Sequence, residues 1–263
     1  MKRKRGSEQI LLGKDEVEFK GSEFIRSAIL ELAKISSLRH HHEPSSLCDS
    51  KNDAATTAAS TASTSTDHCK THDHDIPTIP FLHVCKFLLL EVLDKVGPTM
   101  AVLRQDVNQN IQRLEKLHDI DPSMYKNVVG ILKKENREGT SRKTNSCTRA
   151  LVWLTRSMDF AVSLLEKLSK EPDGNLKKAI EESYEITLKP WHQWISTAAY
   201  RVALRLVPED AKTFINLLMA PDEDYDDLKE EILSLVSSLR PILNEIHCIL
   251  RSFQSDRLKS NSR

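Results

Sequence analysis

Residues 106–116 of this 263-residue chain read DVNQNIQRLEK, a stretch that predicts an α-helix and with it the class of fold. Asp106, Asn110 and Arg113 stand at positions i, i+4 and i+7, so a helix places them within roughly 60° of one another. The positions that would bury this helix are all apolar: Val107, Ile111, Leu114 and Leu117. The stretch therefore predicts an acid, an amide and a guanidinium side by side at the edge of a helical core.

A second predicted helix, over 146–170, repeats this arrangement and adds an aromatic ring. Arg149, Trp153 and Arg156 again stand at i, i+4 and i+7. Its core positions are Leu154, Met158, Ala161, Leu165 and Leu168. Further along, residues 189–194 read KPWHQW, where the proline should bend a helix because it cannot donate a backbone hydrogen bond.

These three stretches, in this order, resemble the signature regions of the glycolipid transfer protein family. The matching segments are 106–116, 151–156 (LVWLTR) and 188–194 (LKPWHQW), and the resemblance covers about residues 81–253. It implies a plant-like member with an N-terminal extension and an all-α fold, a two-layer helical sandwich. It also implies an activity without catalysis, in which sphingolipids, above all glycosylceramides, are bound and transferred between membranes.

The resemblance also implies a role for each polar residue. Asp106 and Asn110 would hydrogen-bond sugar hydroxyls or the lipid amide, and Trp153 would stack on the first sugar ring. His192 would bond the amide region of the ceramide. Trp194 would contact the membrane interface, which indole rings favour.

The arginines are compatible with either a sugar or a phosphate headgroup. Arg113 stands where glycolipid-selective members usually have Lys. Members selective for ceramide phosphate carry two arginines four residues apart in the second helix, whereas glycolipid-selective members carry an apolar residue and then Trp. Arg149 followed by Trp153 mixes the two patterns, and Arg149 with Arg113 could bind phosphate bidentately. Ceramide-1-phosphate transfer is therefore an alternative, and so is a lipid-regulated sensor or scaffold.

Each candidate residue also has a simpler interpretation. Asp106 and Arg113 could be solvated charges, Trp153 a core residue and His192 a capping group. An enzyme is not expected, because no GxSxG elbow, HExxH helix or suitable cysteine nucleophile accompanies Asp106 and His192.

The amino-acid composition limits the kinds of partner that the protein is expected to bind. Acidic and basic residues number 38 each, so the formal charge is zero and nothing favours nucleic acid. Five scattered cysteines without a CxxC pair predict reduced thiols in a cytoplasmic protein. The expected partners are a sphingolipid and, transiently, a membrane surface, for a monomer that needs no cofactor and no metal.

The chain divides into five expected parts. They are a basic flexible tail over 1–21, a helix over 22–38 that packs on the core, a disordered low-complexity insert over 39–78, the main domain over 79–255 and a polar tail over 256–263. Helices of the main domain are expected over about 81–96, 99–118, 122–136 (capped by Asp121 and Pro122), 146–170, 176–206, shortly after Pro208, and over 225–253.

Overall fold

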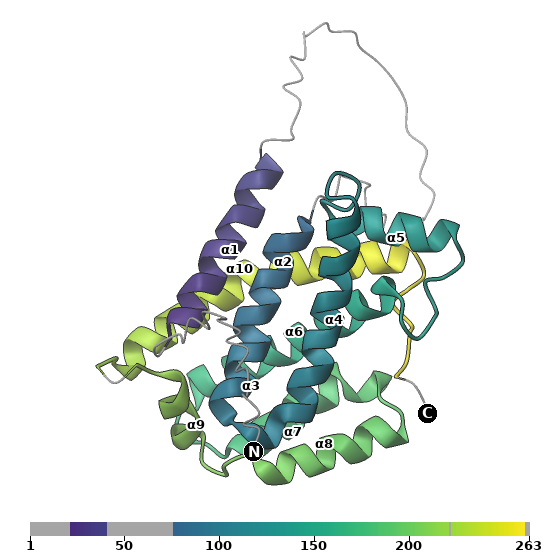
Figure 1. Cartoon of the computed structure of the whole chain (residues 1–263). Helices are drawn as coiled ribbons and strands as arrows, with labels where there is room; N and C mark the ends of the chain where they lie inside the picture. Colours follow the sequence, from purple (N-terminus) through teal and green to yellow (C-terminus); the bar gives the residue numbers. More distant parts are fainter. Residues whose placement is uncertain (1–21, 41–75, 221, 261–263) are drawn as a thin grey trace, which may run out of the picture.

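The computed structural model describes residues 22–40, 76–220 and 222–260 (Figure 1). The expected tail 1–21 and most of the expected insert lie outside the described residues. The elements are α1 (Glu23–His40), α2 (Thr78–Cys85), the π-helical η1 (Lys86–Leu90), α3 (Glu91–Val96), the 3-10 turn η2 (Pro98–Met100), α4 (Ala101–Ile120), α5 (Val128–Arg137), α6 (Cys147–Lys170), α7 (Leu176–Thr187), the 3-10 turn η3 (Lys189–Trp191), α8 (Trp194–Leu206), α9 (Ala211–Leu218) and α10 (Tyr225–Ser252).

These helices form two layers (Figure 1). In one layer α1, the continuous run α2–η1–α3 and α4 lie side by side, and in the other α6 lies between α7 and α10. The layers meet where α1 packs on α10 and α4 packs on α6. The predicted all-α, two-layer architecture is confirmed. In the described part of the chain, no helix is long and apolar enough to cross a membrane.

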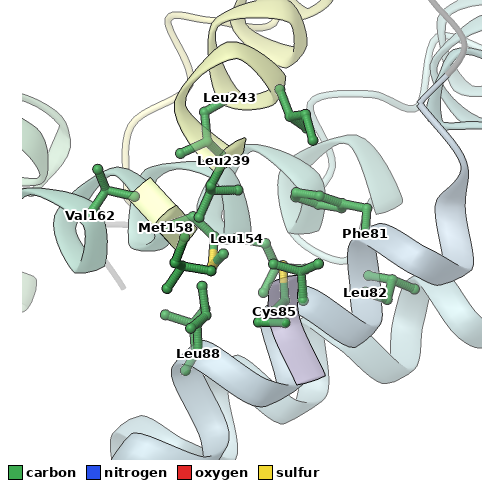
Figure 2. Packing of buried hydrophobic residues seen from close by; sticks show 14 of the residues in the cluster. Phe81, Leu82, Cys85, Leu88, Leu154, Met158, Val162, Leu239 and Leu243 are labelled. Atoms are coloured by element: carbon green, nitrogen blue, oxygen red, sulfur yellow. The ribbon is translucent and has the colours of Figure 1, made fainter. Parts of the chain in front are cut away.

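The space between the layers is filled by apolar side chains (Figure 2). Figure 2 shows side chains of α2 and η1 directed towards those of α6 and α10. The labelled residues are Phe81, Leu82, Cys85, Leu88, Leu154, Met158, Val162, Leu239 and Leu243. A close-packed interior of this kind can admit an apolar guest only if these side chains move apart.

The run α2–η1–α3 changes its winding in the middle. The Glu91 N–H bonds to the carbonyl of Lys86, five residues back, which makes this turn π-helical. Three consecutive leucines of this turn, Leu88, Leu89 and Leu90, are buried. Single π-turns inside α-helices are frequent at functional sites.

The predicted helix 122–136 begins later than expected. Asp121 does not cap a helix that starts at Pro122; its Oδ1 accepts hydrogen bonds from the backbone N–H groups of Ser123 and Met124 and from the Ser123 hydroxyl. This closes a turn and leaves Met124 exposed.

The helix start is delayed by contacts with a distant segment. The Thr78 N–H donates to the Lys126 carbonyl at 2.8 Å, and the Val128 N–H donates to the Ile76 carbonyl at 3.0 Å. These bonds hold Asn127 in an extended conformation, and its side chain caps α5. Ile76 is fully buried, so the main domain begins before its expected start at 79.

The predicted helix 176–206 is two helices rather than one bent helix. α7 ends at Thr187, and Pro190 lies in the 3-10 turn η3. His192 and Gln193 then continue in an extended conformation before α8 begins at Trp194. The interruption frees the imidazole from a helical register and allows it to fold back against α6 and α7.

Candidate functional site

The first group of candidate residues lies on α4. Arg113 Nη1 donates to Asn110 Oδ1 at 3.1 Å, and Asn110 is buried. Asp106 lies one turn earlier. Desolvation raises the pKa of its carboxyl group, and the positive charge of Arg113 partly offsets that rise. The three side chains share one face, as their spacing predicted.

The start of α6 is determined by two capping side chains. Ser146 Oγ accepts from the Arg149 N–H at 3.0 Å. The buried Glu135 carboxylate of α5 accepts from the N–H groups of Cys147 at 2.7 Å and Thr148 at 2.8 Å. A carboxylate here satisfies two free donors and interacts favourably with the helix dipole. The caps thereby orient the polar face of α6.

Arg156 of α6 is the centre of a second group and is only 3% exposed. Its guanidinium carbon lies 4.0 Å from the centroid of the Trp191 ring and 5.1 Å from that of the Trp153 ring. Nη1 donates to the Leu258 carbonyl and Nη2 to the Asp256 carbonyl, both at 2.6 Å. Burial lowers the pKa of Arg156 to about 10, so it stays charged at neutral pH.

His192 joins this group from the extended link between η3 and α8. Its ring centroid lies 5.4 Å from that of Trp153, and its Nδ1 lies 3.2 Å from the Tyr184 hydroxyl oxygen. Burial lowers the pKa of His192, and the charge of Arg156 lowers it further, which favours the neutral imidazole at pH 7. If the Tyr184 hydroxyl donates to Nδ1, Nε2 carries the proton and can donate to a ligand.

Arg149 bonds to the same C-terminal segment as Arg156, residues 256–260. Its Nη1 donates to the Lys259 carbonyl at 2.7 Å. Ser260 holds the end of the segment, because its N–H donates to the Trp191 carbonyl at 3.0 Å and its Oγ accepts from the Gln193 N–H at 2.7 Å. The segment expected as a polar tail beyond the domain thus packs against the site over 256–260.

The structure therefore divides the predicted residues between three places. Asp106, Asn110 and Arg113 lie together on α4; Trp153 and His192 lie together beside Arg156; and Arg149 bonds to the C-terminal segment. α4 packs on α6, and Cys147 Sγ lies 3.6 Å from the Arg113 carbonyl oxygen, so the first group borders the first turn of α6. Trp194 begins α8, and its side chain lies outside the described part of the structure.

Three side chains of the site were not among the predicted headgroup residues. Arg156 had a signal, since it shares the stripe of Arg149 and Trp153. Trp191 lies within a recognised signature segment but its ring contacts Arg156 rather than the core. Tyr184 had no signal, because it reaches His192 only through the chain reversal at η3.

A cavity of about 420 Å³ opens beside this second group. Arg156, Trp191 and Asp256 line one part of it, and Glu166 and Arg240, which form an ion pair, line another. Charged groups of both signs suit water or a polar group rather than an acyl chain. Val162 and Leu243 line this cavity and also belong to the apolar interior of Figure 2, so the two spaces adjoin along α6 and α10.

Comparisons with a family model and with individual proteins point to the same family. The family model "Glycolipid transfer protein (GLTP)" matches residues 76–220. In Arabidopsis thaliana, Glycolipid transfer protein 3 is 52% identical over 186 residues, which are 71% of this chain and 79% of that protein. Glycolipid transfer protein 2 of the same plant is 53% identical over 191 residues, which are 73% of this chain and 85% of that protein.

Solved structures share the fold at lower identity. The FAPP2 structure, described as selecting simple glycosphingolipids with the GLTP fold, superposes with a TM-score of 0.64 and 22% identity over 71% of this chain and 90% of that one. A mutant of Arabidopsis ACD11 (accelerated-cell-death 11) complexed with ceramide-1-phosphate superposes with a TM-score of 0.66 and 19% identity over 88% of this chain and 96% of that one.

Proposed function

The chain belongs to the glycolipid transfer protein family, and from this we propose that it binds a sphingolipid and transfers it between membranes without changing it chemically. Relatives named glycolipid transfer proteins support the transfer activity. We propose a glycosylceramide as the preferred lipid, and the arrangement of Trp153 beside His192 is the observation that carries this preference.

The sugar is proposed to lie between the α4 group and the Trp153 indole. Apolar faces of sugars pack on aromatic rings, while their hydroxyls need acceptors and donors at the edge. The Asp106 carboxylate can accept from hydroxyls. Because Asn110 Oδ1 already accepts from Arg113, the amide nitrogen of Asn110 is directed as a donor. His192 Nε2 is proposed to donate to the carbonyl of the ceramide amide.

The two lipid chains are proposed to enter the interior between the layers (Figure 2). Each buried methylene contributes about 0.8 kcal/mol, so two long chains can offset their removal from a bilayer. Leu88, Met158 and Leu239 would have to move apart. The π-helical turn Lys86–Leu90 is where the α2–η1–α3 run can yield most easily, since it already departs from α-helical winding.

Contact with the membrane is proposed for α8. Val202 and Leu206 are four residues apart on one face and are 59% and 46% exposed. Arg201 and Arg205 adjoin this apolar stripe and are exposed as well. An apolar stripe flanked by cations suits the interface of a bilayer. Trp194 begins the same helix, and its contact with the membrane remains part of this proposal.

Transfer of fluorescent galactosylceramide between neutral vesicles tests the proposed function, with fluorescent ceramide phosphate measured in parallel. We expect the sugar lipid to move well above the rate without protein and faster than the phosphate lipid. Transfer of the phosphate lipid alone would favour the alternative ligand, for which Arg149 beside Trp153 is the supporting feature. Binding without transfer would favour a lipid sensor, and a cleaved product would refute a purely non-enzymatic role.

A further inference from the structure

We propose that the C-terminal segment 256–260 determines the class of headgroup, because it occupies the two guanidinium groups of α6 that would otherwise bind a phosphate. This inference rests on the proposed function and specifies why a sugar lipid is preferred. It assigns a specificity role to main-chain carbonyls rather than to a side chain.

The geometry gives each guanidinium a carbonyl partner. Arg149 Nη1 donates to Lys259, and the two Nη atoms of Arg156 donate to Leu258 and Asp256, all within 2.7 Å. Bidentate binding of a phosphate needs paired guanidinium donors of this kind. While the segment is in place, one donor on each Nη of Arg156 and one donor on Nη1 of Arg149 are used.

The fold holds the segment at both ends. At its start, Gln254 adopts a left-handed conformation with φ of 53°, and the Ser255 N–H bonds back to the Leu250 carbonyl at 2.9 Å. This turn ends α10 and sends the chain back towards α6. At its end, Ser260 bonds to the backbone of Trp191 and Gln193. An acceptor tethered in this way competes at a high effective concentration with a lipid phosphate.

The charges around Arg156 also disfavour a phosphate. The carboxylates of Asp159 and Asp256 lie close enough to Arg156 to stabilise its positive charge. They would also repel a phosphate that approached Arg156. Arg113, on α4, then supplies positive charge to the headgroup beside the carboxylate of Asp106, a mixture that suits hydroxyl groups better than a dianion.

The test compares four full-length or tail-deleted proteins: the unsubstituted chain, a deletion of 256–263, Arg149→Leu, and the deletion combined with Arg149→Leu. The readout is the ratio of ceramide phosphate transfer to galactosylceramide transfer between neutral vesicles. The deletion should raise this ratio about tenfold, since a charge-assisted pair replaces a carbonyl contact. Most of the gain should vanish when Arg149 is also replaced.

A milder variant covers the case in which the deleted protein does not fold. Ser260→Pro removes the N–H that bonds to Trp191 and disturbs Lys259, but it leaves the chain length and the contacts of Arg156 in place. Like the deletion, it should raise the ratio of ceramide phosphate transfer to galactosylceramide transfer. Arg257→Ala, an exposed change in the same segment that touches none of these carbonyls, is the control and should leave the ratio unchanged.

The outcomes separate the two proposals. A ratio that stays the same in Ser260→Pro, or in a folded deletion protein, would overturn this inference while leaving galactosylceramide transfer standing. A gain that persists undiminished without Arg149 would overturn it too. Transfer of neither lipid by any of these proteins would refute the proposed function, and this inference with it.

Discussion

Arg156 joins three segments that are distant in the sequence. Its guanidinium contacts the rings of Trp153 and Trp191, and it bonds to the carbonyls of Asp256 and Leu258. A buried cation is tolerated only where its donors and its charge are compensated, and here aromatic faces and carbonyls do so. The position of the Trp153 indole, and with it the sugar site, therefore depends on Arg156.

Protonation of His192 should destabilise the fold. Burial, followed by the charge of Arg156, lowers the pKa of His192 below its ordinary 6.5, so the unfolded chain takes up a proton at higher pH than the folded one. This contribution to stability is fully present above the unfolded pKa and is lost as the pH falls through the folded pKa. We expect the urea unfolding free energy to drop between pH 7.5 and 5.5, and to drop less in His192→Gln. An equal drop in both proteins would contradict this.

Gln254 should be replaceable by glycine with a gain in stability. Its φ of 53° lies in the left-handed region, which costs an L-residue roughly 1–2 kcal/mol and costs glycine little. Gln254→Gly should therefore raise the melting temperature by roughly 2–4 °C, as about 1 kcal/mol does in a chain of this size. Ser252→Gly, in the last turn of α10, is the matched control and should lower it. Equal losses in both variants would rule out relief of strain at residue 254.

At the scale of elements, the cap on α6 connects stability to the site. Glu135→Ala should cost about 2 kcal/mol of unfolding free energy, because the N–H groups of Cys147 and Thr148 lose a charged acceptor. Glu138→Ala, at the C-cap of the same helix, removes an exposed ion pair with Lys134 and should cost less than about 1 kcal/mol. Chemical denaturation measures both values. Similar costs for the two variants would show that the cap contributes no more than a surface charge.

The exposed face of α8 should determine binding to vesicles. Val202→Glu places a charge in its apolar stripe and should weaken vesicle binding and slow lipid transfer, without lowering the melting temperature. Leu233→Glu, at a comparably exposed site on α10, is the control and should leave both unchanged. Vesicle co-sedimentation gives the first quantity and the transfer assay the second. Equal losses in the two variants would show that an added charge weakens vesicle binding wherever it lies, and would contradict a specific role for α8.

At the scale of the whole molecule, the long helices could be predicted from periodicity. α4, α6 and α10 each carry a continuous apolar stripe, and their predicted ends lie within about two residues of the observed ones. The start of α5 could not be predicted in this way. It depends on hydrogen bonds between Val128 and Ile76 and between Lys126 and Thr78, which are made by backbone atoms some 50 residues apart in the chain.

In the site, too, local features could be predicted from the sequence and long-range contacts could not. The shared face of Asp106, Asn110 and Arg113 follows from the geometry of a single helix, so local spacing was sufficient to predict it. The partner of Arg149 is a main-chain carbonyl 110 residues away. Every residue has such a carbonyl, so the sequence does not indicate which one accepts the bond. Spacing could therefore suggest a phosphate ligand for Arg149 but could not show that the chain itself supplies an acceptor.

The whole arrangement places a polar and aromatic site on α4, α6 and η3, next to an apolar interior held between two helical layers. The most direct test is the initial rate at which Trp153→Ala transfers fluorescent galactosylceramide, compared with the unsubstituted chain and with Trp153→Phe. Loss of ring stacking and of the contacts with His192 should slow Trp153→Ala by about tenfold or more, and Trp153→Phe should keep part of the rate. A folded Trp153→Ala protein that transfers the lipid as fast as the unsubstituted chain would contradict the proposed sugar site.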